Sequence, residues 1–340
     1  MSVRELIVLG TSSQVPTRYR NHNGYLLRWD DEGILFDPGE GTQRQMIYAD
    51  VTATSITRVM ITHFHGDHCL GLAGMSQRLS LDRVPHPVHI HFPASGQVFY
   101  DRLRRASIYH AVAELVPHPI RQEGILHEDE RLILQCRRLD HGVDTYGYRL
   151  EERDRRTMLP DVLAERGVRG RAIGELQRNG EVTVDGQVVR LDEVSVPCPG
   201  QRVAFVMDTR PCRAAIELAE GVDMLIIEST YLSSEQREAN DHGHMTARQA
   251  ATIAREAGAK LVVLTHFSQR YQSLDPFLKE ARAIHPNVVV AKDGRRIPIP
   301  RRQRSDGDGD GDGDGDAAEG ASNLADVKDG EGAGPTEALE

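Results

Sequence analysis

The six residues at positions 63–68 are His-Phe-His-Gly-Asp-His. They constrain the structure of this 340-residue chain more than any other feature, because three imidazoles and a carboxylate lie within one short segment. An apolar segment at 59–62, with the pattern of a buried strand, precedes the run, and a helical pattern follows it. Alternation along an extended chain would send the first two histidines to one side, while Asp67 and His68 would face a second position nearby. Imidazole and carboxylate groups without a thiolate favour zinc, with manganese and iron as alternatives. The run therefore predicts a metal centre at the end of a strand.

Three more potential ligands follow apolar segments later in the chain. They are His141 after 132–139, Asp208 after 203–207 and His266 after 261–265. One histidine or aspartate at a strand end is more often a structural residue that caps a turn or bonds to the backbone. Four strand ends that carry such groups are far less common by accident, and a rigid sheet is well suited to position them. We expect them to meet in one site for two metal ions.

Short β-branched and apolar segments alternate with helical patterns in both halves of the chain. The expected strands are 5–9, 25–28, 34–37, 59–62, 88–91, 131–136 and 146–150, then 203–207, 224–227, 261–265 and 288–290. The expected helices are 41–49, 70–81 and 97–110, then 213–220, 246–257 and 276–284. Alternation repeated in both halves predicts an α/β sandwich of two sheets with outer helices.

Residues 151–200 interrupt this alternation. They are rich in Arg, Glu and Gly and poor in aromatic residues, with one amphipathic stretch at 159–166. We expect an insertion that protrudes from the core. The alternative is a long surface loop with a hairpin at 181–190, since a long loop costs little additional entropy.

The formal net charge of −10 is concentrated at the end of the chain. From Ser305 onward there are 12 acidic residues and one basic residue, Lys328, so residues 1–304 are close to neutral. Asp and Gly alternate from Asp306 to Asp316, a composition that cannot bury apolar surface. We therefore expect one catalytic domain at 1–304 and an acidic, disordered tail at 305–340.

Part of this tail matches the sequence pattern of the EF-hand calcium loop. The matching positions are Asp308, Asp310, Asp312, Gly313 and Glu319. However, Gly315 stands where that loop carries an apolar residue, and no amphipathic helix flanks it. A solvated acidic tail is the favoured interpretation.

Composition excludes several classes of protein. No apolar run approaches the roughly 18 residues that cross a bilayer, and the apolar stretch at 6–9 is too short for a signal peptide. The four cysteines, Cys69, Cys136, Cys198 and Cys212, form no Cys-x-x-Cys pair, which argues against a disulfide framework and a thiolate zinc site. We expect a cytoplasmic protein without a membrane partner.

Several segments outside the metal run carry further signatures. Positions 16–21 read Pro-Thr-Arg-Tyr-Arg-Asn, positions 36–43 read Phe-Asp-Pro-Gly-Glu-Gly-Thr-Gln, and segments 9–12, 228–231, 244–246 and 265–271 add more. With the metal run, they resemble the metallo-β-lactamase superfamily and, within it, the ribonuclease Z family of tRNA 3′-processing endonucleases. Arg18 replaces a lysine of the family's loop, and Pro38 replaces a cysteine. The resemblance covers residues 1 to about 300 and implies an αββα sandwich.

The resemblance implies a role for each ligand. His63, His65 and His141 would hold one zinc ion, Asp67, His68 and His266 would hold a second, and Asp208 would bridge the two. Two metal ions clamp a scissile phosphate and generate hydroxide near neutral pH. Asp67 would in addition act as the general base for this attack.

The resemblance also implies roles for residues that do not bind metal. His244, oriented by Glu228, would bind the phosphate and help to protonate the leaving 3′-oxygen. Arg270 would neutralise phosphate charge, and Arg18 and Arg20 would contact the nucleotide beside the cleavage point. The alternatives stay open: His244 as a residue at a helix N-terminus, Glu228 as a buried ion-pair partner, and the arginines as solvated surface charges.

In the ribonuclease Z family a protruding arm grips the tRNA body, and the insertion at 151–200 has a matching place in the chain. Its arginines would contact phosphates: Arg153, Arg155, Arg156, Arg166, Arg169, Arg171 and Arg178. A Gly-Pro element of the family's arm is replaced here by Gly170-Arg171.

The function implied is a zinc-dependent endoribonuclease, acting as a homodimer, that removes the 3′ trailer from tRNA precursors. Its products would be a tRNA with a 3′-hydroxyl and a trailer with a 5′-phosphate. One alternative keeps the metal site but acts on small phosphodiesters or thioesters. A second alternative is a non-catalytic RNA-binding subunit.

Overall fold

The computed structural model describes residues 3–300 and residue 302. The predicted acidic tail at 305–340, with its match to the EF-hand pattern, lies outside the described residues. No helix in the described part is long and apolar enough to cross a membrane.

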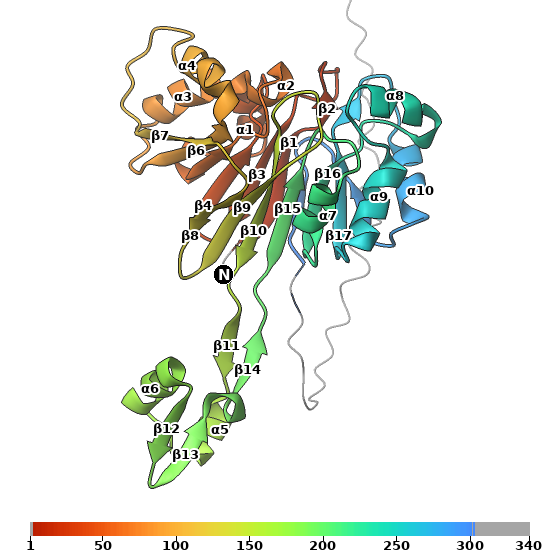
Figure 1. Cartoon of the computed structure of the whole chain (residues 1–340). Helices are drawn as coiled ribbons and strands as arrows, with labels where there is room; N and C mark the ends of the chain where they lie inside the picture. The colour runs from red at the N-terminus through yellow and green to blue at the C-terminus, as the bar shows by residue number, and fades with distance from the viewer. Residues whose placement is uncertain (1–2, 301, 303–340) are drawn as a thin grey trace, which may run out of the picture. The chain divides into compact units, whose positions relative to one another are not determined.

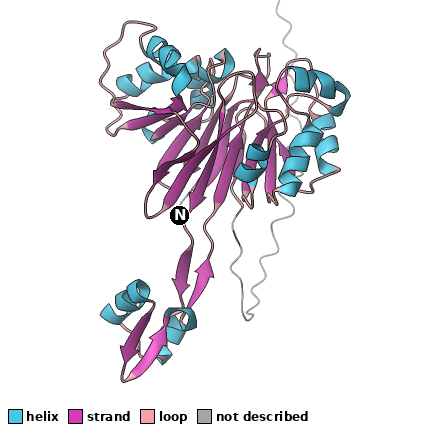
Figure 2. Ribbon diagram, in the orientation of Figure 1, coloured by secondary structure: helices cyan, strands magenta, loops and turns pink. Residues whose placement is uncertain are grey.

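Two mixed sheets of seven strands form the centre of the fold (Figures 1 and 2). The first sheet has the order β20 (Arg296–Pro298), β1 (Arg4–Gly10), β3 (Gly24–Trp29), β4 (Glu32–Phe36), β5 (Arg58–Met60), β6 (Val88–Pro93), β7 (Leu115–Ile120). The second has the order β19 (Val288–Val290), β17 (Leu261–Thr265), β16 (Met224–Glu228), β15 (Arg202–Val206), β10 (Tyr146–Glu152), β9 (Leu132–Arg138), β8 (Gly124–Glu128). In each sheet the four strands from β4 to β7, or from β15 to β19, are parallel, and the others pair antiparallel.

Helices cover the outer face of each sheet. The first sheet carries α1 (Thr42–Tyr48), α2 (Gly66–Cys69), α3 (Gly71–Leu81) and α4 (Gln97–Arg104). The second carries α7 (Arg213–Ala219), α9 (Ala247–Glu256) and α10 (Asp275–Arg282). The short helix α8 (Gln236–Asp241) precedes α9 in the chain. Figure 1 shows α3 and α4 on one side of the sheets and α7, α9 and α10 on the other. The predicted αββα sandwich is thus confirmed.

The strands read as continuous apolar runs because both of their faces are covered. In β1, Leu6 and Val8 point into the core between the sheets, whereas Ile7 and Leu9 point into the core under the helices. Across the inner core, the rings of Phe36 and Phe205 stack with centroids 4.4 Å apart. The two sheets are therefore packed against each other through large apolar side chains.

One predicted helix is shorter than expected. The pattern predicts a helix over 97–110, but α4 ends at Arg104. The residues directly after α4, at 105–108, are exposed to solvent, and Ile108 is fully exposed. Without an apolar face to bury, this segment gains little from continuing the helix.

The segment between β10 and β15 forms a unit with its own small core. The strands β11 (Arg155–Met158) and β14 (Ser195–Cys198) pair as an antiparallel ribbon. Beyond it lie α5 (Pro160–Glu165), α6 (Arg171–Asn179) and the hairpin of β12 (Glu181–Val184) and β13 (Gln187–Arg190). These elements share an apolar cluster that includes Leu163, Leu176 and Val189. In Figure 1 the ribbon leads away from the two large sheets, and we call this segment the arm.

A short pair of strands joins two loops that are distant in the sequence. The strand β2 (Ser12–Ser13) pairs in parallel with β18 (Phe267–Ser268). This pairing holds the loop after β1 against the segment that follows His266, and both segments contribute to the site described next.

Candidate metal centre and active site

Four donor groups converge where β5, β9 and β15 end. His63 Nε2 lies 2.9 Å from His65 Nδ1, and His141 Nε2 lies 3.4 Å from the same His65 atom. Asp208 Oδ2 lies 3.6 Å from His63 Nε2 and 3.8 Å from His141 Nε2. The run at 63–68 and two of the distant strand ends thus form one cluster of potential ligands.

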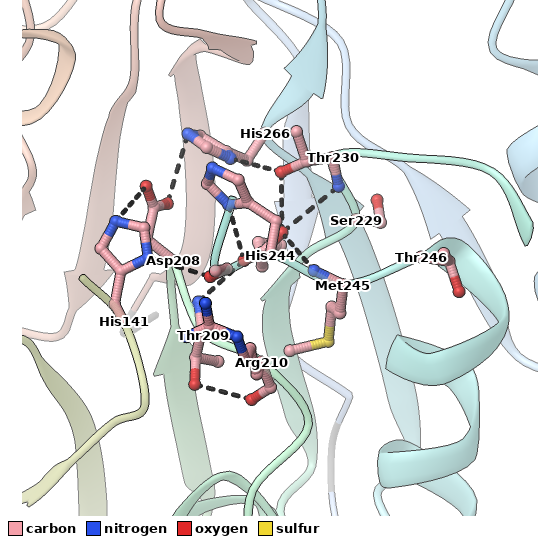
Figure 3. A network of polar contacts seen from close by, with 12 residues as sticks. His141, Asp208, Thr209, Arg210, Ser229, Thr230, His244, Met245, Thr246 and His266 are labelled. Atoms are coloured by element: carbon pink, nitrogen blue, oxygen red, sulfur yellow. Dashed lines mark hydrogen bonds and ion pairs between the residues drawn. The ribbon is translucent and has the colours of Figure 1, made fainter. Parts of the chain in front are cut away.

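A second cluster shares Asp208 with the first. Asp67 Oδ2 lies 3.4 Å from His68 Nε2 and 3.5 Å from His266 Nε2. Asp208 Oδ2 lies 3.3 Å from His68 Nε2, and Asp208 Oδ1 lies 3.3 Å from His266 Nε2. All seven predicted ligands are therefore brought together, and the two oxygens of Asp208 reach both clusters, as Figure 3 shows for His141 and His266.

The second ring nitrogen of four ligand histidines is already engaged. The contacts are His63 Nδ1 to Thr62 Oγ1 at 3.0 Å, His68 Nδ1 to Asp37 Oδ2 at 2.8 Å, His141 Nδ1 to the Gly243 carbonyl at 2.9 Å and His266 Nδ1 to Thr230 Oγ1 at 2.8 Å. Both threonine hydroxyls donate to a carboxylate, so they accept from the imidazoles. Each of these rings therefore carries a proton on Nδ1, so Nε2 is the ring atom that faces the cluster and would bind a metal.

Inward lone pairs at these distances fit metal ions. His266 Nε2 and Asp208 Oδ1 are buried without a hydrogen-bond partner among the described residues. Buried polar atoms are normally paired, so such atoms indicate an additional ligand. Five imidazoles and two carboxylates without a thiolate suit zinc. Partners on the opposite ring nitrogen are also typical of histidines that bind metals.

The electrostatics of the site also favour bound metal cations. Burial, together with the neighbouring His68, lowers the pKa of His63, which keeps the ring neutral as a metal ligand must be. For His68, burial acts against the charged form, but the carboxylates of Asp208, Asp67 and Asp37 outweigh it and raise its pKa. The site thus holds an excess of negative charge that cations would neutralise.

Three residues at strand ends have left-handed backbone conformations, which non-glycine residues rarely adopt. Asp37 has φ 42°, Asp208 has φ 44° and His266 has φ 61°. Such conformations cost about 1–3 kcal/mol each and cluster at functional sites. Here they place a carboxylate or an imidazole at the point where a strand ends.

His244 lies beside Asp208 and His266 (Figure 3). Glu228 orients its ring. Its Nδ1 donates to Glu228 Oε1 at 3.0 Å, and the fully buried Glu228 also accepts from the backbone amides of Thr209 and Met245. Burial opposes the charged imidazole, but the carboxylates of Glu228 and Asp208 outweigh it and raise the pKa of His244 to about 9. His244 also precedes α9, whose N-terminus is capped by the neighbouring Thr246 rather than by His244.

The predicted substrate-binding arginines have different environments. Arg20 donates from Nη1 to the Tyr271 carbonyl at 2.9 Å and from Nη2 to the Ser268 carbonyl at 3.1 Å. Arg270 forms an ion pair with Glu238 and lies over the Tyr231 ring, 5.0 Å from its centroid. Arg18 is exposed and has no ion pair among the described residues. Of the three, Arg18 is the one whose guanidinium is uncommitted.

A cavity of about 340 Å³ opens onto these groups. Residues from both clusters line it, with Gln14 and His22 from the loop after β1 and His244 from the opposite side. The backbone amide of Gln14 donates to Asp67 Oδ2 at 2.8 Å. The loop that carries the predicted Arg18 and Arg20 is thus joined directly to the metal-binding run.

Sequence reasoning missed the residues that orient the ligands. Asp37, Thr62 and Thr230 were not singled out, although Asp37 and Thr230 lie in segments that match family signatures. The available signal for Asp37 was its place directly after an apolar strand, the same position that identified Asp208.

An αββα sandwich with a double cluster of histidines and aspartates at its strand ends defines a metal-dependent hydrolase of the metallo-β-lactamase class. A family model described as "Metallo-beta-lactamase superfamily" matches residues 17–266. The chain is 55% identical over 304 residues to "Ribonuclease Z" of Streptomyces avermitilis, which covers 89% of this chain and all of the relative. It is 56% identical over 304 residues to "Ribonuclease Z" of Salinispora arenicola, with 89% and 98% coverage.

Solved structures agree with this relationship. The structure of human tRNase Z, short form, superposes with a TM-score of 0.64 at 27% identity and covers 87% of this chain and 99% of its own. This chain belongs to the ribonuclease Z family of metal-dependent endoribonucleases. The resemblance and the enzyme class predicted from the sequence are confirmed.

Proposed function

We propose that this chain is a zinc-dependent endoribonuclease that removes the 3′ trailer from tRNA precursors. The products are a tRNA with a 3′-hydroxyl and a trailer with a 5′-phosphate. The observation that carries the proposal is the convergence of seven potential metal ligands with His244 in a chain 55% identical to a ribonuclease Z. Four of the seven line one cavity together with His244. The four free cysteines agree with a reducing, cytoplasmic location.

Each subunit would hold two zinc ions. His63, His65 and His141 would bind one, Asp67, His68 and His266 would bind the other, and Asp208 would reach both. When bound, a pair of zinc ions polarises a phosphate and lowers the pKa of an attacking water.

Asp67 is the proposed general base. Its contacts with the Gln14 amide, His68 and His266 all use Oδ2, which leaves Oδ1 without a partner among the described residues. The neighbouring imidazoles outweigh the effect of burial and hold the pKa of Asp67 below its usual range, so the carboxyl stays ionised. In this role Oδ1 accepts the proton of the attacking water.

His244 is the proposed proton donor to the leaving group. Its Nδ1 is committed to Glu228, so Nε2 is the atom available to the substrate. Glu228 stabilises the imidazolium, and His244 lines the cavity. In this role Nε2 donates to the phosphate first and to the 3′-oxygen of the tRNA as that bond breaks.

The arm would hold the tRNA body through its free arginines. Arg153, Arg155 and Arg166 pair with Glu128, Glu152 and Glu193 respectively, and Arg156 donates to Ser195. Arg169, Arg171 and Arg178 are exposed and have no ion pair among the described residues. These three lie on or just before α6 and are available for RNA phosphates.

A second copy of the chain would cover the outer face of α1, α3 and α4. This face and the loop after α4 expose several apolar side chains: Tyr48, Leu81, Phe99 and Ile108. Monomeric proteins rarely expose so many apolar groups on neighbouring elements. In the homodimer, the arm of one subunit holds the tRNA that the other subunit cleaves.

A cleavage assay tests the proposal. Zinc-loaded protein is incubated with a precursor tRNA, and cleavage is expected directly after the discriminator nucleotide, with Asp67→Ala inactive. An intact trailer would overturn the proposal. Faster turnover of a chromogenic phosphodiester than of the precursor would favour a small-substrate hydrolase, and far fewer than two metal ions per chain would favour a non-catalytic RNA-binding subunit.

A further inference from the structure

A second cavity, of about 550 Å³, shares one loop of its wall with the catalytic cavity. The loop after β1 contributes to both: Gln14 and His22 line the catalytic cavity, while Tyr19 and Arg20 line the second. The remaining wall of the second cavity comes from the segment before α10 and from the segment after β19. This loop is therefore the element through which the two cavities are related.

Partly buried hydrogen bonds hold the walls of this cavity in place. Arg20 donates to the carbonyls of Ser268 and Tyr271, which ties the loop to the segment after His266. Asp293 accepts from the Asn21 amide at 2.6 Å and from Thr11 Oγ1 at 2.8 Å, which ties the same loop to the segment after β19. The cavity is therefore preformed.

The groups that remain free in this cavity are those that bind single-stranded RNA. The side chain of Tyr19 is 83% exposed and makes no ring contact among the described residues. Lys292 is exposed without an ion pair in the described part of the chain, and the exposed Gln272 amide makes no side-chain hydrogen bond there. Aromatic stacking, a cation for phosphate and an amide for base edges are the usual elements of such sites.

Two carboxylates, Asp275 and Asp293, also line the cavity, and both accept hydrogen bonds. Asp293 is bonded to the loop as described, and Asp275 accepts from Ser273 Oγ at 3.1 Å. The donors to both carboxylates are uncharged, so Asp293 and Asp275 are held in place without an ion pair among the described residues. Lys292 remains as the free cation that a phosphate would meet.

We propose that this cavity is a subsite for the trailer, which takes one nucleotide downstream of the scissile bond. The base stacks on Tyr19 and the phosphate contacts Lys292. The cavity has the size of a small-molecule site, so an unstacked nucleotide enters whereas a duplex stem does not. The inference rests on the proposed function, because the trailer is the single strand that continues beyond the cleavage point.

The experiment compares precursors whose trailers of four nucleotides each carry one abasic position. With the full-length, zinc-loaded protein, kcat/KM is expected to fall about tenfold when one particular base is missing. Tyr19→Ala should lose the same factor on the intact trailer and lose nothing further on that abasic trailer. Tyr19→Phe, which keeps the stacking face, should behave as the wild type.

Lysine variants provide the matched test of the phosphate contact. Lys292→Ala should lower kcat/KM for trailers that reach the cavity, whereas Lys279→Ala, an exposed lysine of α10 outside the cavity, should not. Binding of the processed tRNA without trailer should be unchanged in Tyr19→Ala and Lys292→Ala.

The outcomes separate this inference from the proposed function. If wild-type protein cleaves precursors but no abasic position matters, or if Tyr19→Ala and the abasic change act additively, the trailer subsite is wrong. Weaker binding of processed tRNA by the variants would equally overturn it, since the cavity would then serve the tRNA end. If wild-type protein cleaves no precursor, the proposed function fails and this inference fails with it.

Discussion

His68 donates a hydrogen bond from Nδ1 to Asp37 Oδ2 at 2.8 Å, and both side chains are fully buried. Asp37 also accepts from the Thr62 amide and from Thr62 Oγ1, both at 2.8 Å. Thr62 in turn accepts from His63, so one carboxylate at the end of β4 supports a ligand of each metal cluster. The two clusters share this support as well as Asp208.

Removing this support should weaken metal binding. Asp37→Ala is expected to lower zinc affinity about 10–100-fold, because the His68 ring loses the acceptor that sets its tautomer and orientation. Competition with a chromogenic chelator measures the affinity. Asp31→Asn, at an exposed carboxylate paired with Arg131, is the matched control. Equal zinc affinity in Asp37→Ala and wild type would contradict this role.

His244 should matter for turnover and not for metal content. His244→Ala is expected to lower kcat about 10²–10³-fold, as for loss of a general acid, with two zinc ions retained. Glu228→Gln should lower kcat in the same direction, because Glu228 stabilises the His244 imidazolium. Loss of zinc in His244→Ala would show instead that His244 is a ligand, since it also lies beside Asp208 and His266. His110→Ala, at an exposed histidine of another loop, is the control.

Stability should fall on acidification because of a buried histidine outside the site. Burial, with repulsion from His118 and Arg58, lowers the pKa of His91 from 6.5 to about 3. The unfolded chain binds this proton more readily, so stability is fully present above about pH 6.5 and declines as the pH falls toward 3. The expected loss attributable to His91 is at most about 1.4 kcal/mol per pH unit.

Denaturant unfolding of metal-free protein between pH 7 and 4.5 measures this effect, and comparison of the wild type with a His91 variant removes the contribution of the other histidines, which both proteins share. The free energy of unfolding of His91→Phe should depend less steeply on pH than that of wild type. Parallel pH profiles for the two proteins would contradict the assignment to His91.

The arm should act on substrate binding alone. Arg169→Glu with Arg171→Glu is expected to raise KM for precursor tRNA and to reduce the dependence of binding on salt by about one unit of slope per lost phosphate contact. Turnover of a small chromogenic phosphodiester should not change. Arg213→Glu, an exposed arginine of α7, is the matched control. An unchanged KM in the arm variant would remove these arginines from tRNA binding.

The apolar face of α3 and α4 should control association. Leu81→Asp with Phe99→Asp is expected to convert the dimer to a monomer in light scattering, because charges at a buried apolar interface are costly. Val188→Asp, at an exposed valine of the arm, should leave the mass unchanged. A dimer that persists in the double variant would place the interface elsewhere.

Much of the fold was predictable because its patterns are local. The strands that end near the site, such as β5 and β17, are apolar runs bounded by polar groups. In contrast, β7 contains Pro117 and Pro119, which disfavour a strand. It forms at the end of its sheet, where a missing amide leaves no neighbouring strand unpaired.

The sequence by itself determined which donor groups the candidate metal centre contains, because the run at 63–68 and the groups at the three other strand ends are visible locally. Only the tertiary structure decided that Asp37 supports His68 from 31 residues away and that Thr230 orients His266 from 36 residues away. It likewise decided that Arg20 bonds to a distant backbone while Arg18 remains free. The reason is physical: a residue's type and local pattern show what its side chain can bind, but its partner depends on which strands pair and how the sheets pack.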